Sequence, residues 1–202
     1  MNEIKKIPML ADASRVVVMN KDNKLIKDNL NRILHRSIAG DMVAVYGFCH
    51  EGKLKIYGKD KDEQTIGQDL KSFMESVDST MEKKYPEIDR PIEEILMLGT
   101  PPEHQSRLIC VTMPDDYPYA GNSFLAYPGF LHRMYAKYGN FILSPISTKE
   151  VILARTSGGE IAELKRATQE ALEYVNRTLN GPKEFLSNFN YYFDGEKLEV
   201  IV

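Results

Sequence analysis

The sequence predicts an α+β fold, with a mostly antiparallel sheet built from hairpins and with helices packed on one face. Two segments, 66–81 and 160–179, carry apolar residues at the 3.6-residue period of amphipathic helices. Short apolar or β-branched runs bounded by turn residues predict strands that pair with their neighbours along the chain. With 202 residues, of which 43% are hydrophobic, the chain is long enough for either two lobes, 1–98 and 99–202, or a single compact domain.

The first sixty residues predict a strand, a helix and a hairpin. Residues 15–19 (RVVVM) are short and β-branched, which favours a strand. The apolar positions of 26–34 fall at helical spacing, so we expect an amphipathic helix that ends near Ala39-Gly40. Residues 42–48 are almost wholly apolar, and in 53–57 apolar residues alternate with lysines. These two runs predict a hairpin whose second strand is exposed.

The middle of the chain predicts two helices and a rigid loop. The helix over 66–81 ends at Tyr85-Pro86, because the residue before a proline disfavours helical geometry. Pro91 occupies a favoured first position and opens a short second helix. Residues 100–103 (TPPE) form a stiff connection, so two lobes would meet near 99–106.

The following segment predicts two strands and a helix. Residues 108–113 (LICVTM) and 123–127 (SFLAY) have the composition of strands. Pro128 can begin a helix, and Gly139-Asn140 provides the residues that end one.

The last strands are predicted as pairs. Residues 141–143 and 150–154 are apolar runs separated by a polar connection. Asp194-Gly195 is the residue pair favoured in type I′ turns, so 190–193 and 197–202 are expected to form a hairpin.

Composition excludes few functional classes. The formal net charge of −3 gives no strong whole-chain attraction to nucleic acid or to anionic membranes. No stretch approaches the roughly 20 apolar residues that cross a bilayer, and the N-terminus lacks the core of a secretion signal. Cys49 and Cys110 form no CxxC pair, so we expect a reduced cytoplasmic protein without disulfides.

Three motifs carry a resemblance to a known family: FILSPISTKEVILA (141–154), VNRT (175–178) and FLSNFNYYFDG (185–195). A fourth, weaker one is YPEIDRPIEEIL (85–96). In this order they resemble an uncharacterised bacterial family of domains of unknown function, common in gut Clostridia, over about residues 85–200. The family has a histidine where this chain has Lys149, which argues against a catalytic role for that position. The resemblance implies a fold and no activity.

The segment Ser157-Gly158-Gly159 lies between a predicted strand and a predicted helix. Backbone N–H groups at such a helix start can bind an anion. The spacing matches neither GxxxxGK[ST] nor GxGxxG, so a simple turn is favoured and an anion site is the alternative.

The histidines show no metal-ligand spacing, and no cofactor or metal site is predicted; they are His35, His50, His104 and His132. His104 lies in a predicted loop and is the least implausible general base, although the sequence identifies no nucleophile for it.

The loop DDYPYAGN is the best candidate recognition surface, through Asp115, Asp116, Tyr117 and Tyr119. Tyrosine is favoured at interfaces because one end is apolar and the other is polar. The alternative is that these rings only cover the core.

Basic residues also gather on the predicted first helix: Lys21, Lys24, Lys27, Arg32, His35 and Arg36. This face could contact nucleic-acid phosphates or an acidic partner, or it could simply be solvated.

These features favour a non-enzymatic cytoplasmic binding or regulatory protein that acts through protein or small-ligand contacts. The alternative is a small enzyme, for example a hydrolase that uses His104 with Asp115 or Asp116 near an anion at 157–159. A second alternative is weak nucleic-acid binding through the basic helix, although nucleic acid is the less favoured partner. The sequence leaves catalysis and oligomeric state open.

Overall fold

The computed structural model describes the main elements of the chain and gives no account of several connecting segments. The described residues are 13–51, 53–59, 66, 69–98, 106–114, 122–156, 161–179, 181 and 185–201.

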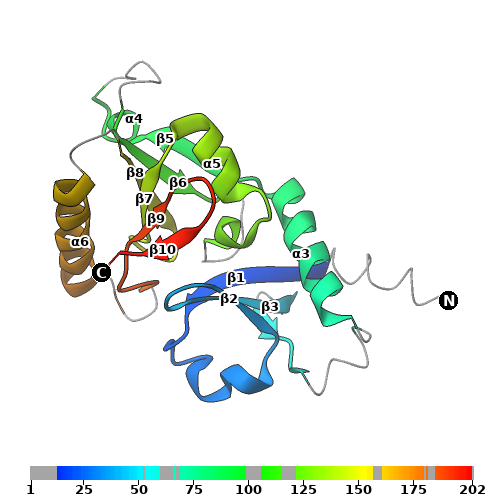
Figure 1. Ribbon diagram of the computed structural model, residues 1–202. Helices are drawn as coiled ribbons and strands as arrows, with labels where there is room; N and C mark the ends of the chain where they lie inside the picture. Colours follow the sequence, from blue (N-terminus) through cyan, green and yellow to red (C-terminus); the bar gives the residue numbers. More distant parts are fainter. Residues whose placement is uncertain are drawn as a thin grey trace.

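Two antiparallel sheets form the body of the protein (Figure 1). The first has the order β1-β3-β2, and β4 also pairs with β3. Its strands are β1 (Ser14–Asn20), β2 (His35–Ala39), β3 (Met42–His50) and β4 (Lys53–Ile56). The second is six-stranded with the order β10-β9-β7-β8-β6-β5. Its strands are β5 (Ile88–Pro91), β6 (Leu108–Thr112), β7 (Phe141–Ser144), β8 (Glu150–Arg155), β9 (Tyr191–Phe193) and β10 (Leu198–Val200).

The helices complete an α+β fold, as the sequence predicts. They are η1 (Lys27–Arg32), α3 (Leu70–Lys84), α4 (Ile92–Ile95), η2 (Ser123–Ala126), α5 (Phe130–Tyr138) and α6 (Ile161–Thr178), of which η1 and η2 are 3₁₀ helices. None of the described helices is long and apolar enough to cross a membrane.

Helices lie on both faces of the six-stranded sheet, whereas the sequence led us to expect them on one. The Lys165 ammonium of α6 lies 5.3 Å from the ring centre of Tyr192, and Tyr135 of α5 packs edge-on at 6.1 Å from Phe193. Neighbouring residues of a strand point to opposite faces, so α5 and α6 are on opposite sides, as Figure 1 shows. All four residues of β7 are buried, as expected for a strand whose sheet is covered on both faces.

One hydrophobic core joins the two sheets. It contains Val16 and Tyr46 of the first sheet together with Val111 and Leu153 of the second. The predicted lobe boundary at 98–99 falls between β5 and β6, which pair in the same sheet. The division into two lobes stays a prediction.

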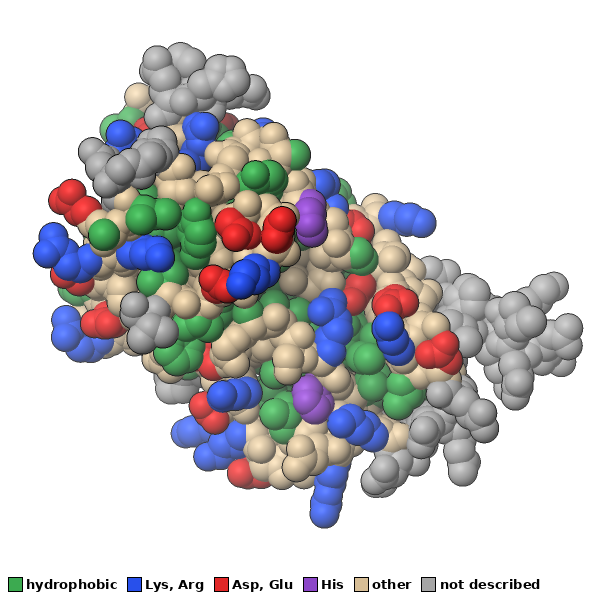
Figure 2. Space-filling model, in the orientation of Figure 1, with side chains coloured by type: hydrophobic (Ala, Val, Ile, Leu, Met, Phe, Trp, Pro, Cys, Tyr) green, Lys and Arg blue, Asp and Glu red, His purple; other side chains and the backbone are tan. Residues whose placement is uncertain are grey.

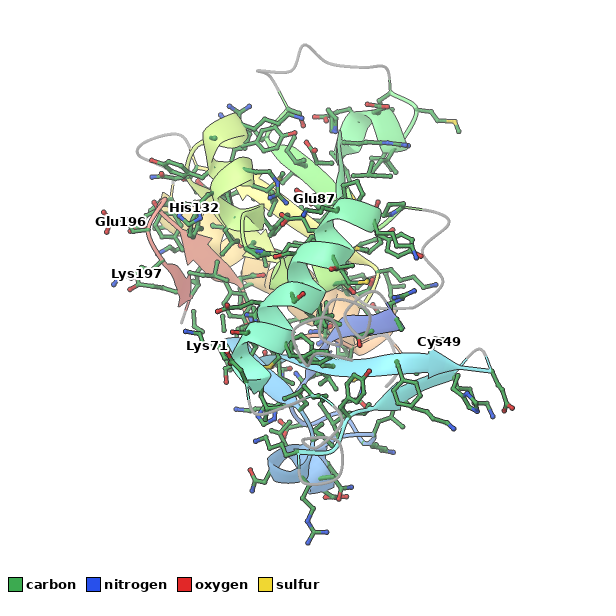
Figure 3. All side chains as sticks on the ribbon, turned by 90° about the vertical axis from the view of Figure 1, so that its right-hand side faces the viewer. Cys49, Lys71, Glu87, His132, Glu196 and Lys197 are labelled. Atoms are coloured by element: carbon green, nitrogen blue, oxygen red, sulfur yellow. The ribbon has the colours of Figure 1, made fainter. Side chains whose placement is uncertain are left out.

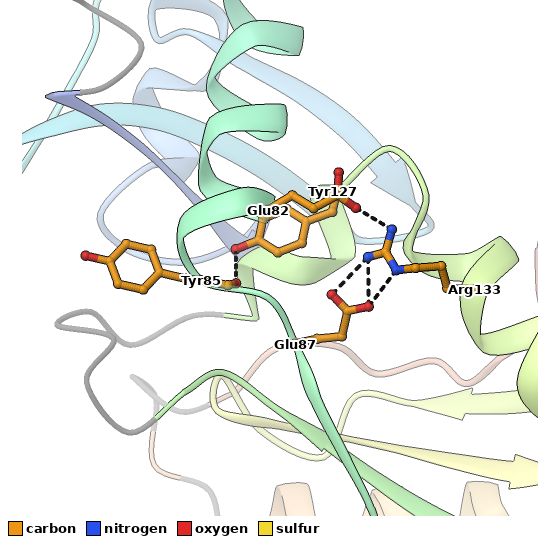
Figure 4. Close-up of polar contacts among 5 residues, drawn as sticks. All are labelled: Glu82, Tyr85, Glu87, Tyr127 and Arg133. Carbon is orange, nitrogen blue, oxygen red and sulfur yellow. Dashed lines mark hydrogen bonds and ion pairs between the residues drawn. The ribbon is translucent and has the colours of Figure 1, made fainter.

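Ion pairs attach α5 to the end of α3 and to the start of β5 (Figure 4). The Arg133 guanidinium forms a bidentate ion pair with Glu87, at 2.7 and 2.9 Å, and a second pair with Glu82. The Tyr127 hydroxyl donates to the Tyr85 carbonyl at 3.0 Å. These contacts connect segments that are distant in the sequence.

The predicted helix over 26–40 is wrong. Only Lys27–Arg32 is helical, as a 3₁₀ turn, and Ile33 is already extended. His35–Ala39 is instead β2, which pairs with β3. Gly40, with φ +52°, forms the β2–β3 turn and does not cap a helix. The apolar spacing suggested a helix, but Ile26 is buried because it packs against β3 and not because it lies on a helical face. The strand that follows is fixed by its pairing with β3.

Two further predictions fail, and one turn differs. Residues 123–126 form η2 and not a strand; all four are buried, so no period separates helix from strand there. The sequence also missed β5, whose Pro91 is tolerated because β5 lies at the edge of the sheet. The C-terminal hairpin is confirmed, but its last pair is Phe193 with Leu198. Its loop therefore has four residues and is not a two-residue type I′ turn; the Asp194 carboxylate accepts from two backbone N–H groups of that loop.

The remaining elements are confirmed within one to four residues. Asp69 caps α3 by accepting from the Ser72 N–H at 3.0 Å, and the helix ends at Tyr85. Gly139, with φ +73°, ends α5, and the predicted strands 15–19, 42–48, 108–113, 141–143 and 150–154 are all present.

Candidate functional site

A cavity of about 280 Å³ opens where the end of β8, the start of β6 and the amino end of α6 meet. Its described lining includes two arginines, one glutamate and several apolar residues. Its lining residues are Arg107, Arg155, Thr156, Ile161, Glu163, Leu164 and Ala167. We call this cavity the arginine pocket.

Strand pairing brings the two arginines together. Leu108 pairs with Ala154, and the Arg155 N–H donates to the Arg107 carbonyl at 2.8 Å. The two residues therefore extend from the same end of neighbouring strands, although they are far apart in sequence.

Contacts from other elements fix the Arg155 side chain. Its Nη1 donates to the Ser106 carbonyl at 3.1 Å, and its Nε to the Tyr138 carbonyl at 3.3 Å. The guanidinium carbon also lies 5.9 Å from the Tyr138 ring centre. A guanidinium held in this way loses little further freedom when it binds a ligand.

The helix α6 supplies the apolar wall. Ile161, Leu164 and Ala167 are spaced by three residues and lie along one side of the helix. Glu163, in the first turn of α6, is the acidic residue among the described lining residues. The amino end of a helix carries partial positive charge, which favours anions nearby.

Thr156 connects the pocket to the α5–β7 turn. Its N–H and its hydroxyl both donate to the Asn140 carbonyl, at 2.9 and 3.1 Å. The hydroxyl is thus engaged within the protein, and Thr156 contributes shape to the pocket more than ligand binding.

The residues predicted as an anion site, Ser157, Gly158 and Gly159, lie outside the described residues. The described residues on either side of them, Thr156 and Ile161, both line the arginine pocket. The anion site at 157–159 therefore stays a prediction, and the sequence gave no signal for Arg107 or Arg155.

The predicted recognition loop also lies outside the described residues: Asp115, Asp116, Tyr117 and Tyr119 are not placed. The same holds for His104, on which the hydrolase hypothesis depends. Among the residues that the structure describes, no group of three or more His, Cys, Asp or Glu side chains could hold a metal ion. Figure 3 shows Cys49 at the outer end of β3, far from His132 of α5.

The basic helical face that suggested nucleic-acid binding does not exist in the predicted form. His35 and Arg36 belong to β2, and the Arg36 guanidinium forms an ion pair with Asp78 at 2.7 Å. On the face shown in Figure 2, basic and acidic side chains are interspersed. Binding to nucleic acid stays a less favoured prediction.

A buried polar cluster, which the sequence analysis missed, fastens α3 and η2 to the first sheet. The Arg36 guanidinium donates to Asp78 Oδ2 at 2.7 Å, to the Ala126 carbonyl at 2.6 Å and to the Tyr46 hydroxyl at 2.9 Å. Tyr46 in turn donates to Asp78 Oδ2 at 3.0 Å. Asp78 is only 2% exposed, and its Oδ1 has no hydrogen-bond partner. The sequence signal that could have indicated this cluster is Asp78, a charged residue next to the apolar face of α3.

Burial dominates the electrostatics of this cluster. It raises the pKa of Asp78 to about 6, against the opposing effect of Arg36. Burial also opposes the charge on Arg36, but Tyr46 and Asp78 together raise its pKa. Arg36 is therefore charged at neutral pH, and Asp78 is ionised there at a cost in stability.

The described residues thus define an α+β protein with a small pocket, lined by two arginines and one glutamate, at one end of its larger sheet. Comparisons with protein-family models, with curated proteins and with solved structures found no match. What the pocket binds is inferred below from its own residues.

Proposed function

We propose that this protein is a non-enzymatic binding protein whose ligand presents an anionic group to the arginine pocket. The observation that carries the proposal is the pairing of Arg107 and Arg155 beside the apolar wall of α6. Guanidinium groups bind carboxylates and phosphates through two parallel hydrogen bonds. The apolar wall favours a ligand with a hydrocarbon part next to its charge.

The size and charge of the pocket restrict the ligand further. At about 280 Å³ the cavity is at the small end of ligand sites, which suits a molecule of a few carbons. Glu163 disfavours multiply charged anions, because the two arginines and one glutamate among the described lining residues sum to a single positive charge. A monoanion with an apolar body fits best.

Binding of N-acetyl-leucine, followed by isothermal titration calorimetry or by saturation-transfer NMR, tests the proposal. N-acetyl-leucinamide is the neutral control, and inorganic phosphate tests the charge preference. We expect Arg155→Gln to weaken binding about tenfold or more, since a charge-assisted hydrogen bond contributes about 1.5–3 kcal/mol.

The matched control variant is Arg166→Gln, which removes an exposed arginine of α6 that does not line the pocket. It should leave the affinity unchanged. Equal binding of acid and amide, or an equal loss in both variants, would overturn the proposal.

We also propose membership in the uncharacterised bacterial family that the motifs resemble. The motif segments support this because they correspond to distinct structural parts: β7–β8, the last turn of α6 and the β9–β10 hairpin. Asn176 of VNRT donates to the Ser187 carbonyl at 2.8 Å and so connects two of the motifs. A cytoplasmic setting, inferred from cysteine use, belongs to the same proposal.

A further inference from the structure

The arginine pocket has residues of both charge signs on its lining. Arg107 and Arg155 come from the adjoining ends of β6 and β8, whereas Glu163 comes from the first turn of α6. Within the part of the chain that the structure describes, no ion pair joins Glu163 to either arginine, so the opposite charges lie apart. A ligand that enters the cavity therefore meets basic groups and an acidic group at different places.

The carboxylate of Glu163 has no partner among the described residues. Position i+4 of the helix, where a cation would complete an ion pair, is Ala167, and Arg166 at i+3 forms no ion pair with Glu163. Lys165 lies against the sheet, where its ammonium is 5.3 Å from the Tyr192 ring centre. A carboxylate in the first turn complements the helix dipole, and here it also remains available to a ligand.

The third feature of the lining is the apolar wall of α6. Ile161, Leu164 and Ala167 lie along one side of the helix, and Leu164 follows Glu163 directly in the chain. The pocket thus offers a basic side, an acidic group and an apolar surface. A complementary ligand has a carboxylate, an ammonium group and a hydrocarbon side chain that extend in three directions from one centre.

We propose that the arginine pocket binds a free α-amino acid with an apolar side chain. The carboxylate pairs with Arg107 and Arg155, and the ammonium donates to Glu163. The side chain packs on the apolar wall of α6. Charge-assisted hydrogen bonds of both signs fix the orientation of such a ligand. The inference rests on the proposed function, because the carboxylate is the anionic group assigned there, and it adds the ammonium and the class of molecule.

Other small acids match the lining less completely. A monoanion without an ammonium pairs with the arginines but leaves Glu163 unpaired and close to a second negative charge. An amino acid whose ammonium is at the far end of its chain has its hydrocarbon between the two charges, so the apolar wall stays uncovered. An α-amino acid satisfies all three features of the lining at once.

Isothermal titration calorimetry with two matched ligands tests the inference. The ligands are L-leucine and 4-methylpentanoate, which has the same skeleton without the ammonium. We expect L-leucine to bind about fivefold more tightly than 4-methylpentanoate, as for an ion pair with an exposed carboxylate. Glu163→Gln should abolish this preference by weakening the binding of L-leucine, while 4-methylpentanoate binds at least as tightly as before. A loss of helix stability would instead weaken both ligands together.

The matched control variant is Glu170→Gln, which removes an exposed carboxylate of the same helix that does not line the pocket. It should leave the preference for L-leucine unchanged. If the preference is absent in the wild type, or is the same in Glu163→Gln, the inference is wrong while the proposed function stands. Tighter binding of γ-aminobutyrate than of L-leucine would also overturn it. If neither N-acetyl-leucine nor 4-methylpentanoate binds in an Arg155-dependent way, the proposed function fails instead.

Discussion

Removing Arg36 should make the stability of this protein depend on pH above pH 6. Asp78 is buried, and its pKa of about 6 lies above its ordinary value of 3.8. The native state therefore binds the proton more tightly than the unfolded state. The stability from this group is fully present below pH 3.8 and is lost as the pH rises to about 6. At about 1.4 kcal/mol per pKa unit, the loss is about 3 kcal/mol.

Arg36→Met removes the positive charge that, among the described residues, most favours ionised Asp78, and so raises the pKa of Asp78 further. In the wild type, the contribution of Asp78 is constant above about pH 6, because the carboxyl is then ionised in both states. In the variant it continues to fall, by up to about 1.4 kcal/mol per pH unit. The variant should therefore lose more stability than the wild type between pH 5 and pH 8, by up to about 3 kcal/mol. Loss of the hydrogen bonds to Ala126 and Tyr46 adds a cost that does not depend on pH.

Urea unfolding of the wild type and the variant at pH 5, 6, 7 and 8 measures this difference. Other titrating groups cancel in the comparison of the two chains. The double variant Arg36→Met with Asp78→Asn has no carboxyl at this position, and its stability relative to the Asp78→Asn single variant should not change with pH. A difference between the wild type and Arg36→Met that is the same at pH 5 and pH 8 would refute the reasoning.

Four further substitutions test the packing. Thr148→Val should leave the free energy of unfolding unchanged or raise it by up to about 1 kcal/mol, because the buried Thr148 hydroxyl has no partner; a clear loss in thermal unfolding would reveal one. Gly40→Ala should cost about 2 kcal/mol or more, since a Cβ there would lie 2.8 Å from the Tyr191 hydroxyl at a left-handed φ. Gly139→Ala meets nothing within 4 Å, but the backbone there (φ +73°, ψ −157°) is a conformation that essentially only glycine adopts, so it should cost about 1–3 kcal/mol from conformation alone; no loss in thermal unfolding would contradict this. Asp41→Ala removes a buried carboxylate that accepts from Asn20, Ser187, Tyr191 and the Asn188 N–H, and a loss below about 2 kcal/mol in urea unfolding would show that this cluster contributes little.

Local sequence gave one prediction next to the candidate site, and it stays a prediction. Ser157-Gly158-Gly159 before a helical pattern indicated a possible anion site at the start of α6, and the flanking residues do line the arginine pocket. Arg107 and Arg155 gave no signal, because their proximity depends on the pairing of β6 with β8. The left-handed backbone of Met97, with φ +56°, is equally invisible in sequence, since methionine is ordinary in helices and only its backbone angle is unusual.

The sequence by itself determined the elements whose pattern is local. In α3 and α6 the apolar residues repeat with the helical period over four turns or more, and the turn residues at Gly139 and Asp194 stop or reverse the chain wherever they occur. Tertiary structure decided the segments whose pattern suits two states. His35–Ala39 became a strand because β3 offered it a partner, and Ser123–Ala126 became a 3₁₀ turn in a core that buries it on all sides. Burial on one face leaves a period in the sequence, whereas strand pairing and complete burial leave none.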